Sequence, residues 1–203
     1  MNAVLYEIVI NCFAQPNICI YLQLNSCESY NSANLNTRNM DNKTQISKDS
    51  ASRTINVTRH FAAPVSKVWK AWTDSNELDK WWAPKPWRAE TKTMNFTEGG
   101  MWLYSMVGPD NGDRHWSRVN YEQIDAEKYF NATSIFSDED GNPSDKTIGS
   151  HWHTEFHADG DGTRIHVQLK FDNDADMQLL VSMGFEGGFT MGLNNLEELL
   201  AAQ

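Results

Sequence analysis

The chain has 203 residues and a formal net charge of −10, of which −9 lies in residues 52–203. A surface this acidic repels phosphate backbones and anionic lipid headgroups, which argues against nucleic acid and membranes as partners. All three cysteines lie within the first 27 residues, so the remainder can form neither a disulfide nor a cysteine-ligated metal site, and we expect a cytoplasmic domain stabilised by its apolar core.

Residues 1–51 predict an extension outside the folded domain, either disordered or non-native. Residues 1–24 lack the basic start, the cleavage site and the continuous apolar run of a signal peptide or membrane span. Residues 25–51 are rich in Asn, Ser, Thr and Lys, a composition typical of linkers. A shorter chain could begin at Met40, so we expect residues 1–39 to be dispensable for folding. The folded domain is then predicted over residues 52–203.

The next stretch predicts one strand followed by two short helices. Residues 54–61 alternate between apolar and polar side chains, which indicates a strand. Pro64 suits the first turn of a helix, because its fixed φ is helical and it lacks an N–H that would have no partner there. Apolar residues then recur at helical spacing, namely Val65, Val68, Trp69 and Trp72. Asp74 or Ser75 can cap a second helix, which Pro84 ends.

A pair of tryptophans, Trp81 and Trp82, closes this second helix. Two consecutive residues of a helix point in different directions, so we expect one of the two to be exposed or to lie in an interface. Two interpretations remain for the cluster that they form with Trp87. The tryptophans either fasten the helix to the rim of the sheet or cover the mouth of a cavity.

Six further strands are predicted, over residues 87–97, 101–107, 114–124, 128–137, 147–157 and 163–171. Short turns rich in Gly and Asp join them, which is typical of an antiparallel meander. Gly99 and Gly100 predict a tight turn or bulge rather than a ligand loop. Residues 174–203 predict one long amphipathic helix. This order predicts an α+β fold of the helix-grip type, in which a curved antiparallel sheet wraps around the last helix.

The same segments carry a resemblance to a known family. They are Phe-Ala-Ala-Pro-x-x-x-Val-Trp-x-Ala-Trp-Thr-Asp from residue 61, Leu-x-x-Trp-Trp-x-Pro from residue 78, the Gly pair at 99 and 100, and the Gly-rich final helix. Over residues 52–203 the chain resembles bacterial proteins similar to the C-terminal domain of the heat shock protein 90 ATPase activator, in the START/polyketide-cyclase (SRPBCC) superfamily. One departure is Ala83, where the family usually has Gly.

The resemblance implies the START/Bet v 1-like helix-grip fold and a co-chaperone-like action in which the domain contacts a chaperone. The fuller activator has an additional N-terminal domain. Residues 1–51 are too short and too polar to replace that domain, so we do not expect this chain to stimulate a chaperone ATPase.

Aromatic and methionine side chains outline a candidate cavity between the sheet and the last helix. The candidate ligand-binding residues are Trp82, Trp102, Tyr104, Met106, Phe136, Trp152, Phe156, Met183 and Gly187. The final helix contains four glycines, each costing about 0.5–1 kcal/mol relative to Ala in a helix interior. Two interpretations stay open. The missing side chains either leave a void for an apolar ligand or allow the helix to pack closely on the sheet, with the aromatic residues forming core.

The histidines raise the question of a metal site. His151, His153 and His157 share a strand face with Glu155, and His166 lies on the neighbouring strand. Imidazole and carboxylate groups at such spacing can ligate zinc. However, Trp152 and Phe156 must face the core, which turns the histidines toward solvent, so we predict no metal site and no cofactor.

The inward positions offer little for catalysis. Only Tyr104 and Ser134 supply a polar group there, and we assign no catalytic residue. The sequence therefore predicts a soluble binding module, monomeric or weakly dimeric, for a small apolar ligand or a chaperone-type protein partner. The alternative is a cyclase-like, aromatase-like or hydrolytic enzyme that uses the same cavity.

Overall fold

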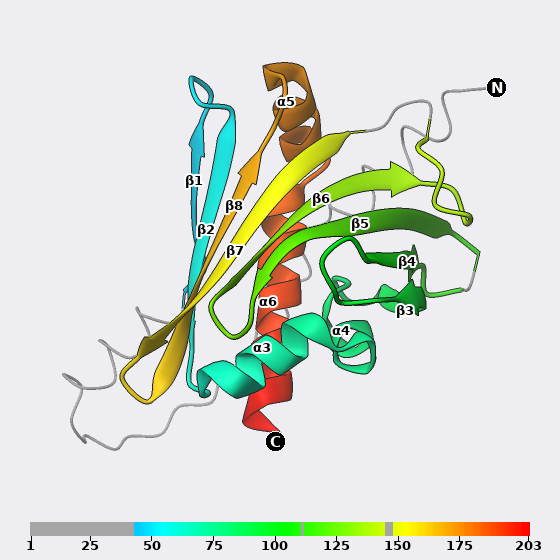
Figure 1. Ribbon diagram of the computed structural model, residues 1–203. Coiled ribbons are helices and arrows are strands. Elements are labelled where there is room, and N and C mark those ends of the chain that lie inside the picture. The colour runs from blue at the N-terminus through cyan, green and yellow to red at the C-terminus, as the bar shows by residue number, and fades with distance from the viewer. Residues whose placement is uncertain (1–42, 111, 145–147) are drawn as a thin grey trace, which may run out of the picture.

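The computed structural model describes residues 43–110, 112–144 and 148–203 (Figure 1). The described strands form one antiparallel sheet of eight, in the order β1-β2-β8-β7-β6-β5-β4-β3. Their bounds are β1 (Gln45–Asp49), β2 (Thr54–Phe61), β3 (Arg88–Met94), β4 (Met101–Val107), β5 (Arg114–Asp125), β6 (Tyr129–Ser137), β7 (Gly149–Asp159) and β8 (Gly162–Lys170). The helices are α3 (Val65–Thr73), α4 (Ser75–Trp81), α5 (Asp174–Ser182) and α6 (Phe185–Ala201).

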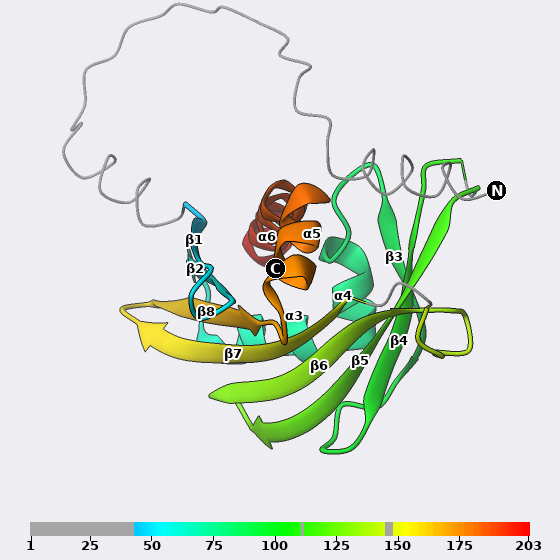
Figure 2. The same ribbon diagram turned by 90° about the horizontal axis from the view of Figure 1, so that it is seen from above.

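The sheet curves around α6, and α5 lies beside α6 within the same concave face (Figure 2). Helices α3 and α4 follow β2 and pack toward the same interior, where α4 contacts both β3 and α6. This arrangement confirms the predicted α+β helix-grip fold. Of the helices described, none is long and apolar enough to cross a membrane.

The sheet begins earlier in the chain than the expected domain boundary at residue 52. Strand β1 pairs antiparallel with β2, from Gln45 opposite Thr58 to Asp49 opposite Thr54. Within β1 only Ile46 is partly buried, and the other four side chains are exposed. An edge strand of this kind is held mainly by backbone hydrogen bonds, so its side chains gave no hydropathy signal. The expected extension over residues 1–39 lies outside the described residues.

The single long helix predicted from residue 174 onward is wrong, because the chain breaks at Gly184. This glycine has φ of 82°, and its N–H donates to the carbonyl of Val181 at 2.9 Å. A left-handed residue is a common way to end a helix, and glycine adopts it without a Cβ penalty. Gly184 therefore separates α5 from α6.

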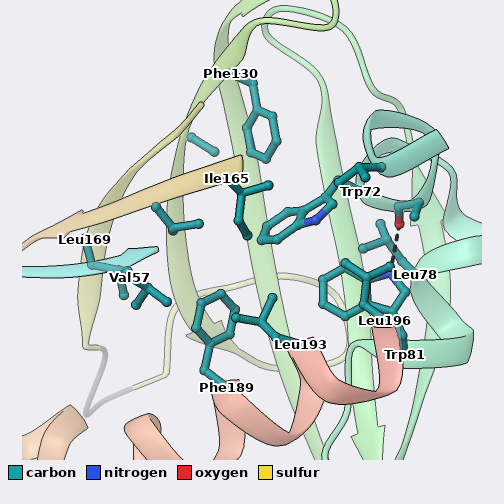
Figure 3. Packing of buried hydrophobic residues seen from close by; sticks show 14 of the residues in the cluster. Val57, Trp72, Leu78, Trp81, Phe130, Ile165, Leu169, Phe189, Leu193 and Leu196 are labelled. Carbon is teal, nitrogen blue, oxygen red and sulfur yellow. Dashed lines mark hydrogen bonds between the residues drawn. The ribbon is translucent and has the colours of Figure 1, made fainter. Parts of the chain in front are cut away.

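The core lies between α6 and strands β2 and β8. Val57, Ile165 and Leu169 of the sheet belong to one buried cluster with Leu193 and Leu196 of α6 (Figure 3). Burial of each such aliphatic side chain contributes about 1.5–3 kcal/mol. These contacts fix α6 over β2 and β8.

Helices α3 and α4 are joined by a buried polar contact. The Trp81 side chain is only 1% exposed, and its indole N–H donates to the Ala71 carbonyl at 2.9 Å (Figure 3). Asp74 caps α4 by accepting a hydrogen bond from the Asn76 N–H at 2.9 Å. The two helices thus form one corner on the inner side of the sheet.

The Gly99–Gly100 segment forms the tight turn that the sequence predicts. Gly99 has φ of 77°, and a Cβ on Gly100 would lie 2.2 Å from the Asn95 carbonyl oxygen. Gly99 donates to the Tyr121 carbonyl, and the Tyr121 N–H donates to the Gly100 carbonyl, each at 2.9 Å. The turn is therefore fastened to β5.

Candidate functional site

A cavity of about 440 Å³ lies between the sheet and the last two helices. Its walls come from strands β4 to β7, from α5, from α6 and from the segment after α4. A smaller hollow of about 50 Å³ continues inward from it, toward α3 and α4. The two share four residues, namely Trp82, Tyr104, Ser134 and Trp152.

Seven of the nine predicted site residues lie at these walls. Three of them, Trp82, Tyr104 and Trp152, line both spaces. The larger cavity is also lined by Met106, Phe136 and Met183, and the smaller hollow by Trp102. Their role in binding a ligand stays a prediction.

The other two predicted residues lie elsewhere. Phe156 is 4% exposed and packs edge-on against Trp69, with ring centroids 5.0 Å apart. It belongs to the core at the far end of β7 and does not line the cavity. Gly187 is exposed to solvent, whereas its neighbour Gly188 is buried and lines the cavity. Successive helical residues point about 100° apart, so an error of one residue moved the predicted position to the outer face.

The glycines of α6 have different surroundings. Gly188 lies at the cavity wall. At Gly192, by contrast, a Cβ would lie only 3.1 Å from the Trp82 carbonyl oxygen, so this glycine lets α6 approach the end of α4 closely.

Three serines form part of the sheet wall of the cavity, and we call this part its floor. Ser134 of β6 lies opposite Ser150 of β7, and Ser117 of β5 lines the same space. Larger side chains at these inward positions would fill it. The void therefore arises from short side chains on three strands as well as from the helix glycine.

Neither tryptophan of the pair is fully exposed, since Trp81 is buried and Trp82 is half-buried, and the expected interface stays a prediction. Trp81 points toward α3, whereas Trp82 lies at the C-cap of α4 and packs against Trp102 and Tyr104, with centroid distances of 5.4 and 6.2 Å. The two side chains therefore both meet apolar surroundings, because α4 lies between α3 and the cavity. Trp87 stacks on His115, a residue of the cavity wall, with ring centroids 5.5 Å apart.

The polar groups of the cavity are predominantly uncharged. Burial raises the pKa of the Tyr104 hydroxyl, an effect that the neighbouring Trp82 and Ser117 side chains oppose. Burial also lowers the pKa of His115, although Asp113 acts in the opposite direction. The buried Nε1 of Trp82 and Nε2 of His115 make no hydrogen bond of ordinary geometry within the described part of the chain. The site thus offers neutral hydrogen-bond donors and acceptors to a bound molecule.

Known proteins resemble this arrangement in sequence and in structure. Residues 62–201 match the family described as Activator of Hsp90 ATPase homolog 1-like protein. The chain belongs to this family. A search of curated proteins found no significant match.

Several solved bacterial structures share the fold. A crystal structure from Mycobacterium smegmatis is 28% identical with a TM-score of 0.72, and the match covers 78% of this chain and 98% of that one. A solution structure from Arthrobacter aurescens is 28% identical with a TM-score of 0.73, covering 78% and 92%. A crystal structure from Nitrosomonas europaea is 25% identical with a TM-score of 0.66, covering 76% and 97%.

In this member of the activator-homologue family, the sequence analysis does not identify several polar wall residues, among them His115, Ser117 and Ser150. The signal was present. Alternation along β5 from the buried Tyr121 places Ser117 and His115 on the same inner face.

The histidine cluster of this family member lies on the outer face of β7 and β8. His166 Nδ1 lies 3.2 Å from a Glu155 carboxylate oxygen, and His153 Nε2 and His157 Nε2 lie at 3.3 and 3.6 Å. The nearby Asn131 side chain bonds to His153 at 2.5 Å. Among the described residues, no group of His, Cys, Asp or Glu is arranged to hold a metal ion.

Proposed function

We propose that this protein binds a small apolar molecule in the cavity between the sheet and helices α5 and α6. The observation that supports this most is the cavity of about 440 Å³, a volume within the range of about 300–1,000 Å³ that is usual for small-molecule sites. Aromatic and aliphatic side chains dominate its walls, and a few neutral polar groups lie among them. Apolar walls with few polar groups are typical of such sites.

Two alternatives have less support. The proposal of a chaperone-type protein partner rests on the family description. In the described part of the chain, the only large hydrophobic residues that are exposed are Met101 at 37% and Met191 at 43%, which gives little apolar surface for such a partner. An enzyme of the cyclase or hydrolase type would use the same cavity, and the described wall residues include no carboxylate. The cavity therefore favours a binding function.

The test measures binding of the neutral fluorescent dye N-phenyl-1-naphthylamine to the purified full chain. Ser134→Leu adds an apolar side chain to the floor of the cavity, and we expect it to abolish dye binding. Thr133→Leu is the matched control. Thr133 lies next to Ser134 on the opposite face of β6, where it accepts a hydrogen bond from Asn120, so the control should bind dye as the unaltered protein does.

Dye binding that is equal in the unaltered protein and in a folded Ser134→Leu variant would contradict the proposal. Incubation with small aryl esters and aromatic polyketides separates the enzyme alternative. Turnover by the unaltered protein that Ser134→Leu removes would favour an enzyme over a binding protein.

A further inference from the structure

One buried hydrogen-bond donor of the cavity makes no hydrogen bond of ordinary geometry within the described part of the chain. The Trp82 Nε1 atom is buried beside the Tyr104 hydroxyl, which is too poorly aligned to satisfy it, and Trp82 lines both the cavity and the smaller hollow. An indole N–H can only donate. Leaving such a donor unpaired in a buried place is unfavourable, so an acceptor atom brought in by a ligand would be stabilised there.

Three neighbouring tryptophans differ from Trp82 in this respect. The Trp102 indole N–H donates to the Thr91 hydroxyl at 2.9 Å, and that of Trp152 donates to the Ser150 hydroxyl at 2.8 Å. Trp81 donates to a backbone carbonyl. Within this aromatic cluster, the cavity-facing donor that remains for a ligand is therefore that of Trp82.

The inner wall carries no permanent positive charge for an anionic acceptor. Arg114 is the one permanently charged side chain among the described wall residues, but it alternates with the inward His115 and lies on the outer face of β5. There it donates to the Ser105 hydroxyl at 2.7 Å and shares the Glu90 carboxylate with Arg88. Burying a carboxylate without a partner charge is strongly unfavourable. The acceptor that suits this site is an uncharged oxygen.

We propose that the ligand is an uncharged molecule with an apolar body and a carbonyl oxygen, as in a ketone or an ester, and that this oxygen accepts a hydrogen bond from Trp82 Nε1. The proposal rests on the proposed function, since it assigns a ligand class to the same cavity. The aromatic rings around Trp82, including Trp152 at 6.1 Å and Phe189 at 6.1 Å between centroids, would surround the apolar body. The Tyr104 hydroxyl, kept neutral by burial, lies beside the same donor.

The test compares three probes that share one aromatic body, namely 2-acetylnaphthalene, 2-ethylnaphthalene and 2-naphthoate. The affinity of each probe is measured at pH 7 by its displacement of N-phenyl-1-naphthylamine from the full chain. We expect the ketone to bind roughly 3- to 10-fold more tightly than the hydrocarbon, which is the effect of one net hydrogen bond. The carboxylate should bind most weakly of the three.

Two variants locate the donor. In Trp82→Phe the ratio of ketone affinity to hydrocarbon affinity should fall to about one. The substitution also removes apolar contacts, but both probes lose these contacts equally, so the ratio does not change on that account. Trp72→Phe is the matched control, because Trp72 also has a buried Nε1 without a partner but lines only the smaller hollow. It should keep the preference for the ketone.

Infrared spectroscopy of the bound ketone keeps the proposal testable if Trp82→Phe does not fold. In the unaltered protein, the carbonyl band should lie at lower frequency than in a hydrocarbon solvent, as a hydrogen bond requires. Three outcomes would overturn the proposal and leave the proposed function intact. They are equal affinity for ketone and hydrocarbon, a carboxylate that binds as tightly as the ketone, and a ketone preference lost in Trp72→Phe but kept in Trp82→Phe. If no probe binds and the dye does not bind, the proposed function itself fails.

Discussion

Glu155 shows how a single outward residue of the sheet organises its neighbours. Its carboxylate lies within 3.6 Å of nitrogen atoms of His153, His157 and His166. Partial burial disfavours the charged carboxylate, but hydrogen bonds from His166 and His153, with the charge of His153, outweigh that effect and lower the pKa of Glu155. The cluster therefore stabilises the folded state through an ionised carboxylate.

This cluster predicts a pH-dependent stability. The pKa of Glu155 is lower in the folded chain than its ordinary value of 4.5, so its contribution is present above that value and is lost as the pH falls through the folded pKa. We expect Glu155→Gln to lower the free energy of unfolding at pH 7 by up to about 1 kcal/mol, because the group is partly exposed. The difference should shrink as the pH falls below 4.5.

Urea denaturation of both proteins between pH 3 and pH 7 provides the measurement. The exposed Glu122 of β5 offers a control, and Glu122→Gln should leave the unfolding free energy nearly unchanged throughout. A loss in Glu155→Gln that is as large at pH 3 as at pH 7 would show that packing, and not charge, carries the effect.

At the level of single residues, strand alternation predicted side-chain direction well, whereas helix phase was less certain. Trp102, Tyr104 and Met106 lie on the inner face because a strand has a period of two. Gly187 was placed on the wrong face because one residue in a helix changes direction by about 100°. Polar wall residues such as His115 were overlooked, since a buried polar side chain has no hydropathy signal of its own.

The elements were predicted where their periodicity is long and uninterrupted. The two helices after β2 and the strands of the meander fall close to their predicted positions. The break between α5 and α6 was missed because apolar residues continue through it, among them Leu180, Met183 and Phe185. A backbone angle, and not a change of hydropathy, separates the two helices, and Gly184 was the only available signal.

The junction makes a prediction that distinguishes two glycines three residues apart. Gly184→Ala should destabilise the protein by about 1–2 kcal/mol, because Gly184 has φ of 82° and a Cβ is unfavourable in that conformation. Gly187→Ala should instead stabilise it by about 0.5–1 kcal/mol, since Gly187 is exposed within α6. Chemical denaturation of both variants measures these changes. Equal effects of the two substitutions would contradict the assignment of Gly184 as the break.

On the scale of the whole molecule, the family motifs predicted the fold, whereas the edge of the sheet was not predicted. Strand β1 lies in a polar segment whose composition indicates a linker. The contacts of β1 lie at this edge of the sheet. Just before the strand, Arg59 donates a hydrogen bond to the Thr44 hydroxyl at 2.7 Å, and within the strand Lys48 forms an ion pair with Glu186. Such contacts depend on tertiary position, which hydropathy does not report.

Truncation tests where the folded unit begins. A chain of residues 40–203 keeps β1 and should have the Tm of the full chain. A chain of residues 52–203 lacks β1, so we expect a Tm lower by roughly 5 °C or more. It should also self-associate, since β2 becomes an exposed edge. Differential scanning calorimetry and size-exclusion chromatography provide the two measurements. A monomeric 52–203 chain with an unchanged Tm would show that β1 is not part of the stable unit.

The serine floor of the cavity has a consequence for how such a protein can evolve. Ser117, Ser134 and Ser150 lie on strands that are paired on both sides, so their backbones are held in place whatever side chain they carry. A substitution at one of them would change the size of the molecule that fits and leave both helices in position. Single substitutions on this floor therefore alter the volume of the cavity and leave the surrounding elements in place, so that cavity volume and fold can change independently.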